Sequence, residues 1–166
     1  MSTEKHNIDQ ILVDMQDRLC AFLDESDITE PLLIGIHTGG LWVAEHIRQT
    51  LGINSPLGEL NIAFYRDDFS RIGIHPHVTP SSLPFDIEDR HILLIDDVLH
   101  TGRTIRAAMN EIFDYGRPAS ISLAVLIDRS GRELPIHANV IGKRLELKAT
   151  EHVKLLGPEP LALEFK

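Results

Sequence analysis

Two adjacent aspartates, followed by a turn of hydroxyl side chains and glycine, are the residues best suited to do chemistry. Asp96 and Asp97 follow the apolar stretch His91–Ile95, and the turn Thr101–Thr104 begins four residues after Asp97. Ionised carboxylates accept hydrogen bonds from the neighbouring hydroxyls of a ribose. Backbone N–H groups, hydroxyls and a glycine at the start of a helix suit a phosphate monoester. This combination predicts a site for a sugar phosphate.

Each half of this pattern also has a purely structural explanation. Aspartates that follow a strand often cap the next helix, and Thr-Gly pairs are common in turns. The full run, placed between a buried strand and a helix, favours the ligand site over those two explanations.

The elements around the aspartates predict a parallel sheet. Short apolar stretches at 32–36, 91–95 and 121–127 are typical of strands buried on both faces, and 60–65 alternates like a strand. Apolar residues at helical spacing predict helices over 8–23, 42–51 and 105–113. This alternation predicts an α/β fold with a doubly wound, mostly parallel sheet flanked by helices. Ligands bind beyond the carboxyl ends of such strands, and the turns expected there follow Ile36, Tyr65, Ile95 and Ile127.

The segment from Arg66 to Arg90 has no periodicity and contains three prolines: Pro76, Pro80 and Pro84. A loop of that length inside a compact domain is more often a functional lid than a packing accident. We therefore expect it to cover the site.

Composition limits the remaining possibilities. The 166 residues suit one domain, 1–166, and 43% of them are hydrophobic, as in a soluble globular protein. No apolar run approaches the roughly 20 residues of a membrane span, and a single cysteine agrees with a reducing compartment. We expect a cytoplasmic protein with no membrane partner. The net charge of −9 argues against a surface that is basic throughout, but a local basic patch is compatible with it.

The chain resembles a known family. The stretch His91–Thr104 resembles the signature of type I phosphoribosyltransferases that binds 5-phosphoribosyl-1-pyrophosphate (PRPP). Further segments are similar to the bifunctional pyrimidine-operon regulators and uracil phosphoribosyltransferases, the PyrR family, and the similarity covers about residues 8–157. These segments are 64–70, 116–120, 128–129, 132–136 and 141–143.

The resemblance implies a role for each site residue. Asp96 and Asp97 would hold the ribose diol and support Mg²⁺ indirectly, as the ion that accompanies PRPP, and Arg66 would help to close the site. A lid at about 67–89 would shut over PRPP, and a small base-binding hood at about 128–157 would include Arg129 and Val153. The PRPP-binding residues would be Thr38, Gly39, Asp96, Asp97, Val98, Leu99, His100, Thr101, Gly102, Arg103 and Thr104.

The resemblance also implies the function. It implies a uracil phosphoribosyltransferase that forms UMP and pyrophosphate and, as a second function, control of pyrimidine genes through an RNA leader and uridine nucleotides. A homodimer or homotetramer is implied as well. Two alternatives stay open: a purine phosphoribosyltransferase, and a nucleotide-sensing or RNA-binding attenuator with little catalysis. His37 and Gly39 stand where better-known members carry basic residues, so positive charge near the pyrophosphate is missing. The charged residues of the first predicted helix are mostly acidic, which weighs against RNA binding.

Overall fold

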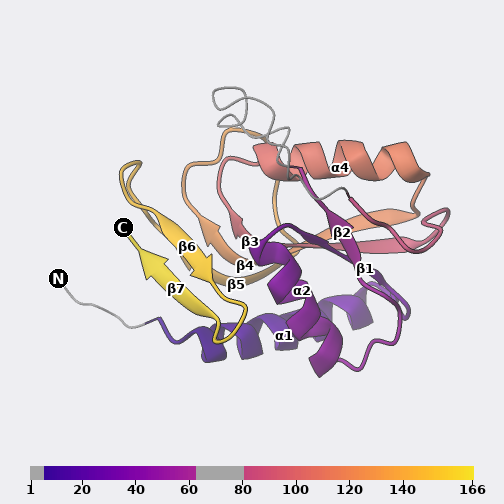
Figure 1. The fold of residues 1–166 in the computed structure, drawn as a ribbon, viewed down its shortest axis with the longest axis horizontal. Coiled ribbons are helices and arrows are strands. Elements are labelled where there is room, and N and C mark those ends of the chain that lie inside the picture. The colour runs from indigo at the N-terminus through magenta and orange to yellow at the C-terminus, as the bar shows by residue number, and fades with distance from the viewer. Residues whose placement is uncertain (1–5, 63–80) are drawn as a thin grey trace.

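The computed structural model describes residues 6–62 and 81–166 of the chain (Figure 1). In these two segments the strands form a five-stranded sheet in the order β2-β1-β3-β4-β5 and a two-stranded sheet, β6-β7. Every pair in the larger sheet is parallel, and β6 and β7 are antiparallel. The elements are α1 (Ile8–Glu25), β1 (Leu32–Ile36), α2 (Gly39–Thr50), β2 (Gly58–Leu60), β3 (His91–Leu99), α4 (Arg103–Tyr115), β4 (Ser120–Arg129), β5 (Val140–Leu145), β6 (Val153–Leu156) and β7 (Ala162–Phe165).

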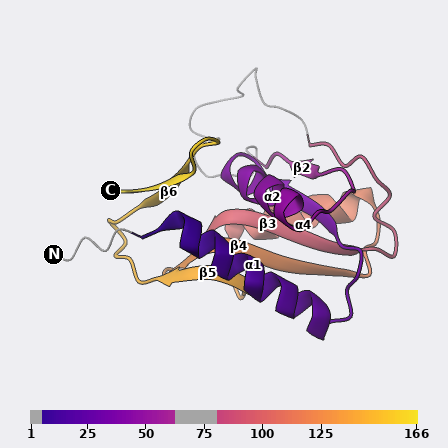
Figure 2. The ribbon, with the colours of Figure 1, turned by 90° about the horizontal axis from the view of Figure 1, so that it is seen from below.

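The helices cover both faces of the parallel sheet. Figures 1 and 2 show α1 and α2 on one face and α4 on the other. Two apolar clusters fill the layers between them: Met15 and Leu19 of α1 belong to the first, and Ile105 and Ile112 of α4 belong to the second. Met15 and Leu19 are fully buried, and each such side chain contributes about 1.5–3 kcal/mol. The predicted doubly wound α/β fold is therefore confirmed.

Local sequence explains where α1 and α4 begin and how closely α2 packs on the sheet. The Asn7 side chain accepts hydrogen bonds from the backbone N–H groups of Asp9 (3.0 Å) and Gln10 (3.3 Å) and so caps α1. Gly35 brings α2 close to β1, because a Cβ there would lie 2.8 Å from the Cα of Leu41. Gly102 precedes α4 with a φ of +96°, a conformation that glycine adopts without strain.

Two strands differ from the sequence-based expectation. β3 continues to Leu99, so that Asp96 and Asp97 lie within the strand rather than after it, because Val98 and Leu99 pair with Ile127 and Asp128 of β4. β2 covers Gly58–Leu60 instead of beginning at residue 60. The expected continuation of that strand to residue 65 lies partly outside the described residues.

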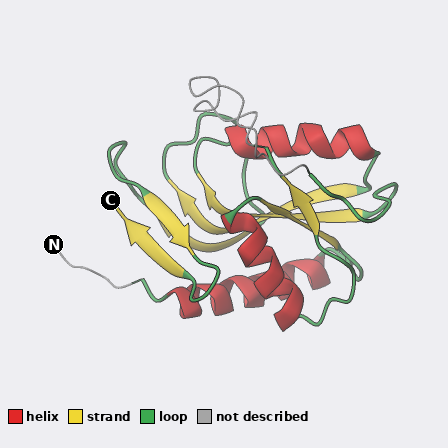
Figure 3. Cartoon of the chain, viewed as in Figure 1, coloured by secondary structure: helices red, strands yellow, loops and turns green. Residues whose placement is uncertain are grey.

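The β6–β7 hairpin forms a separate small layer. Figure 3 shows it beyond the end of the sheet toward which the β4 and β5 arrows point. Leu155 of β6 is buried against the cluster that also holds α1 and α2, and Gly157 packs on Trp42 of α2 at distances that leave no room for a Cβ. The hairpin therefore overhangs the carboxyl end of the sheet. In the described segments no helix is both long and apolar enough to cross a membrane.

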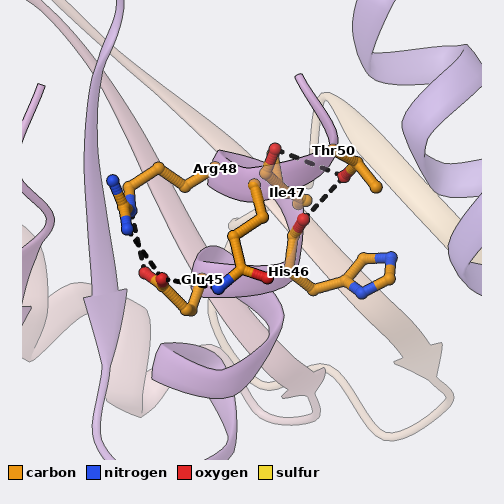
Figure 4. A network of polar contacts seen from close by, with 6 residues as sticks. Glu45, His46, Ile47, Arg48 and Thr50 are labelled. Atoms are coloured by element: carbon orange, nitrogen blue, oxygen red, sulfur yellow. Dashed lines mark hydrogen bonds and ion pairs between the residues drawn. The ribbon is translucent and has the colours of Figure 1, made fainter. Parts of the chain in front are cut away.

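The far end of α2 carries a surface network of polar side chains (Figure 4). Arg48 binds Glu45 through two hydrogen bonds of 2.7 and 2.8 Å, and the bond from Arg48 holds the pKa of Glu45 below its usual value. Both side chains are roughly one-third exposed, so solvent screens the pair and it adds little to the stability of the fold. Because this pair lies at the opposite end of α2 from Gly39, a substitution of Arg48 is a suitable control for changes near the site.

Candidate active site

The two aspartates turn their carboxylates back toward their own strand. Asp96 is 4% exposed, and its Oδ1 accepts the backbone N–H of Asp97 at 2.9 Å. Asp97 is half-buried, and its Oδ1 accepts the N–H of Val98 at 2.8 Å. These bonds hold both carboxylates against the backbone of β3.

A glycine pair at the start of α2 packs directly on this acid pair. A Cβ at Gly39 would overlap the carboxylate of Asp97, with 2.7 Å to its Cγ. A Cβ at Gly40 would lie 2.7 Å from the carbonyl oxygen of Ile95 and 2.9 Å from the Cα of Asp96. Real Cβ atoms do not approach other heavy atoms so closely, and only glycine therefore fits both positions without a shift. The first turn of α2, with Thr38 exposed before it, is held against β3.

His37 is anchored at the end of β1 beside this turn. Its Nε2 lies 3.1 Å from Oε2 of Glu59 in β2, and its backbone N–H donates to the carbonyl of Leu60. The parallel register pairs Gly35 with Glu59, which explains why His37 and Glu59 meet. The arrangement places an imidazole–carboxylate pair immediately before Thr38.

The second turn links β3 to α4. The hydroxyl of Thr101 accepts the N–H of Arg103 at 3.2 Å, and the carbonyl of Thr101 accepts the N–H groups of Glu133 and Leu134. Arg103 pairs with Glu133 at 2.8 Å on the surface. The loop itself is shorter than expected, since Val98 and Leu99 belong to β3 and α4 begins at Arg103. We call residues 100–104 the phosphate turn.

The end of β4 is bonded to the segment that leads into the β6–β7 hairpin. The guanidinium of Arg129, 4% exposed, donates to the carbonyls of Ser130, Lys148 and Glu151. Val153, the first residue of β6, is half-buried against the core. The Arg129 guanidinium therefore holds the segment 148–151, and Val153 packs on the core.

The comparisons with known proteins agree on one family. Residues 6–155 match the phosphoribosyl transferase domain family. The chain is 58% identical to the bifunctional protein PyrR of Nitrosococcus oceani over 162 residues, 96% of this chain and 92% of the relative. It is 59% identical to the bifunctional protein PyrR of Pseudomonas entomophila over 157 residues, 95% of this chain and 89% of the relative. The chain belongs to the PyrR family.

Solved structures of other phosphoribosyltransferases share the fold with this PyrR family member. A hypoxanthine-guanine phosphoribosyltransferase of Bacillus anthracis superimposes with a TM-score of 0.67 at 13% identity, over 84% of this chain and 81% of that one. A hypoxanthine phosphoribosyltransferase of Staphylococcus aureus gives 0.65 at 19% identity, over 86% and 77%. At these identities the likeness shows the fold alone.

Of the residues that the sequence predicted for the site, the structure places the first turn of α2 against the acid pair. Gly39 packs on Asp97, and Thr38 precedes it. The phosphate turn follows β3 in the same chain segment. Arg66 and residues 67–80 of the expected lid lie outside the described residues. The expectation was wrong for residues 81–89, because Ile87 is buried in the core and Ser82 pairs with Glu59.

Two residues that bear on the PyrR site were missed by sequence reasoning. Glu59 had no signal in the sequence, since its meeting with His37 depends on the register between β1 and β2. Ser130 had none either, although its hydroxyl is bonded to both the N–H and the carbonyl of Leu147 at 2.9 Å.

His100 begins the phosphate turn and has a pKa below the ordinary value for histidine. Burial lowers this pKa most, followed by the charge of Arg129; His152 and Arg132 act in the same direction and Glu133 opposes them. Its Nε2 faces Gly131, where a Cβ would lie 2.8 Å away. The imidazole is therefore neutral at pH 7 and supplies no fixed positive charge to the turn.

This pKa makes part of the stability depend on pH. Because the unfolded chain takes up the proton first, the contribution of His100 is complete above about pH 6.5 and is lost as the pH falls through the lower folded pKa. We expect His100→Asn to reduce the loss of stability between pH 7.5 and 5.5, measured by urea unfolding. An identical loss in both proteins would contradict this assignment.

Proposed function

We propose that this chain transfers the phosphoribosyl group of PRPP to uracil and releases pyrophosphate. The main support is the packing of the Gly39–Gly40 turn on Asp96 and Asp97, next in the chain to the phosphate turn, in a member of the PyrR family. An acid pair suits the ribose hydroxyls, and helix N-termini suit phosphate groups.

Each part of the substrate is assigned to one element. Thr38 and Gly39 would bind the pyrophosphate, Asp96 and Asp97 the ribose, and residues 98–104 the 5-phosphate. The hood, at about 128–157, would hold the base, with Arg129 and Val153 in its wall. Arg66 and the part of the expected lid at 67–80 would close over PRPP. Residues 1–166 would form a single domain. The protein would act in the cytoplasm, as a homodimer or homotetramer.

The reaction replaces pyrophosphate at the anomeric carbon with a ring nitrogen of uracil. The C–N bond forms as the C–O bond breaks, pyrophosphate leaves with the electron pair, and the nitrogen loses its proton to solvent. Positive charge develops on the sugar, near Asp96 and Asp97, and negative charge develops on the leaving group, near the N-terminus of α2. Positioning and electrostatics therefore account for the catalysis without a covalent intermediate on the protein.

Mg²⁺ fits these residues as the companion of PRPP. Magnesium prefers oxygen ligands and is usually held by one or two carboxylates together with substrate phosphates. Asp96 and Asp97 supply two neighbouring carboxylates, each held by a backbone N–H group of β3. When bound, the ion would neutralise charge on the pyrophosphate.

The test is the release of pyrophosphate from PRPP and Mg²⁺ with each of five nucleobases. Release that depends on uracil, with UMP as the product, is the expected result. Release only with hypoxanthine or guanine would replace this proposal with a purine phosphoribosyltransferase, and no release with any base would favour a regulator without catalysis.

A second candidate function, binding of an RNA leader, is favoured by a groove between α1 and β5. The groove has a volume of about 920 Å³, and its lining includes Arg18, Lys143 and Arg144 but a single carboxylate, Asp14. RNA affinity draws on such cations. A gel-shift assay against a pyrimidine-operon leader at 0.1 M salt, with and without UMP, tests RNA binding. We expect the wild type to shift the RNA and Lys143→Ala/Arg144→Ala to weaken that shift. No shift by the wild type would dismiss this second function.

A further inference from the structure

The turn that follows β4 carries two arginines three residues apart, and they bind different parts of the site. Arg129 is the last residue of β4, and Arg132 follows it. Both guanidinium groups donate mainly to backbone carbonyls. Their partners lie in separate chain segments, which makes the two side chains natural controls for each other.

Arg129 fixes the segment that leads into the hairpin. Its Nε donates to the carbonyl of Ser130 at 3.2 Å, and its two terminal nitrogens donate to the carbonyls of Glu151 at 2.7 Å and Lys148 at 3.2 Å. Glu151 also accepts the N–H of Lys148 at 2.6 Å through its side chain. Two residues after Glu151, β6 begins at Val153. Arg129 therefore helps to set the position of the hood.

Ser130 holds the start of the same segment, at Leu147, through its side chain. Its hydroxyl donates to the carbonyl of Leu147 and accepts the N–H of Leu147, both at 2.9 Å. Together with Arg129 it ties residues 147–151 to the end of β4. Since three carbonyls in a fixed arrangement need the planar fork of a guanidinium, the single ammonium of lysine cannot replace all three bonds.

Arg132 holds the phosphate turn instead. It donates to the carbonyl of His100, to the carbonyl of Ile136 at 2.8 Å and to Oδ1 of Asp128 at 2.5 Å. The two residues after it donate their N–H groups to the carbonyl of Thr101. The backbone of the phosphate turn is thus held in place by the segment that starts at Arg132.

We propose that Arg129 and Arg132 are positioning residues with separate effects: Arg129 sets the geometry of the base site through the hood, and Arg132 sets that of the PRPP site through the phosphate turn. Neither needs to touch a substrate. The inference rests on the proposed uracil phosphoribosyltransferase activity for its kinetic readout.

The kinetic test compares Arg129→Lys with Arg132→Lys. Displacement of a binding element by about 1 Å can cost about 100-fold, so we expect Arg129→Lys to raise KM for uracil about 10- to 100-fold and to change KM for PRPP less than about threefold. Arg132→Lys is expected to show the reverse. Arg48→Lys, on the surface of α2 (Figure 4), should leave both constants unchanged. Equal rises of both constants in both arginine variants would overturn the proposal.

Two further measurements keep the test independent of folding and of activity. Ser130→Ala leaves the buried cation in place, and we expect it to raise KM for uracil in the same direction by a smaller factor; no change would contradict the role of the segment 147–151. Hydrogen exchange should accelerate at residues 147–156 in Arg129→Lys and at residues 100–106 in Arg132→Lys. If the wild type releases no pyrophosphate, the proposed function fails, and the exchange pattern alone decides whether the two arginines act separately.

Discussion

The double variant Asp96→Asn/Asp97→Asn is expected to lose about 10²- to 10⁴-fold in kcat/KM for PRPP. Asparagine keeps the size of aspartate and an oxygen that can accept the N–H bonds of Asp97 and Val98. It lacks the negative charge that the ribose hydroxyls and the developing positive charge require. Two hydrogen bonds to charged groups, at about 1.5–3 kcal/mol each, give this range. Uracil-dependent pyrophosphate release measures it.

Its control has the same change of charge elsewhere. Asp24→Asn/Asp114→Asn alters one exposed aspartate on α1 and one on α4, and we expect full activity from it. Both double variants should unfold within about 1 kcal/mol of the wild type, because the substitutions preserve side-chain volume. Normal PRPP binding by the Asp96/Asp97 variant, measured by calorimetry, would refute the assignment of the acid pair.

Gly40→Ala is expected to lower activity by about 100-fold and to destabilise the fold by about 1–3 kcal/mol. The new methyl group would lie 2.7 Å from the carbonyl oxygen of Ile95 and 2.9 Å from the Cα of Asp96. Because these are backbone atoms, α2 and β3 must move apart, and the separation displaces Asp96 from the Gly39–Gly40 turn. Pyrophosphate release and urea unfolding measure the two effects.

Two other glycines separate the crowding from general effects of substitution. At Gly39 a methyl group conflicts with the side chain of Asp97, which can rotate, so we expect Gly39→Ala to raise KM for PRPP with little change in stability. At Gly52 a Cβ would meet nothing within 4 Å, and asparagine tolerates its φ of +64°. Gly52→Asn should therefore behave as the wild type; a Gly40→Ala variant that also did so would show that the close packing is unnecessary.

Periodicity and composition were sufficient to predict the layers of this fold. The stretches around Ile34, Leu93 and Leu123 are apolar on both faces and form central strands of the sheet. The acid pair misled the prediction of where β3 ends, since adjacent charges usually mark the exit from a buried strand. Here the pairing of Val98 and Leu99 with β4 extends the strand, and the carboxylates of Asp96 and Asp97 accept N–H groups of their own strand.

The long-range polar contacts could not be predicted in the same way. The partners of Arg129 lie 19 and 22 residues away in an irregular segment, where no spacing indicates which carbonyl faces which side chain. The pair formed by His37 and Glu59 depends on strand register in the same sense. The resemblance to a family placed Arg129 in the expected hood, and the structure shows that its guanidinium holds the carbonyls of Lys148 and Glu151.

The parallel topology of the sheet has a kinetic consequence. The residues assigned to the substrate come from the ends of β1, β3 and β4, which are neighbours in the sheet and are separated along the chain by crossovers. Contacts between distant parts of a chain form slowly, because loop closure costs entropy before it is rewarded. During refolding from urea, helical circular dichroism should consequently return well before enzymatic competence, so that recovered turnover reports the last event of assembly.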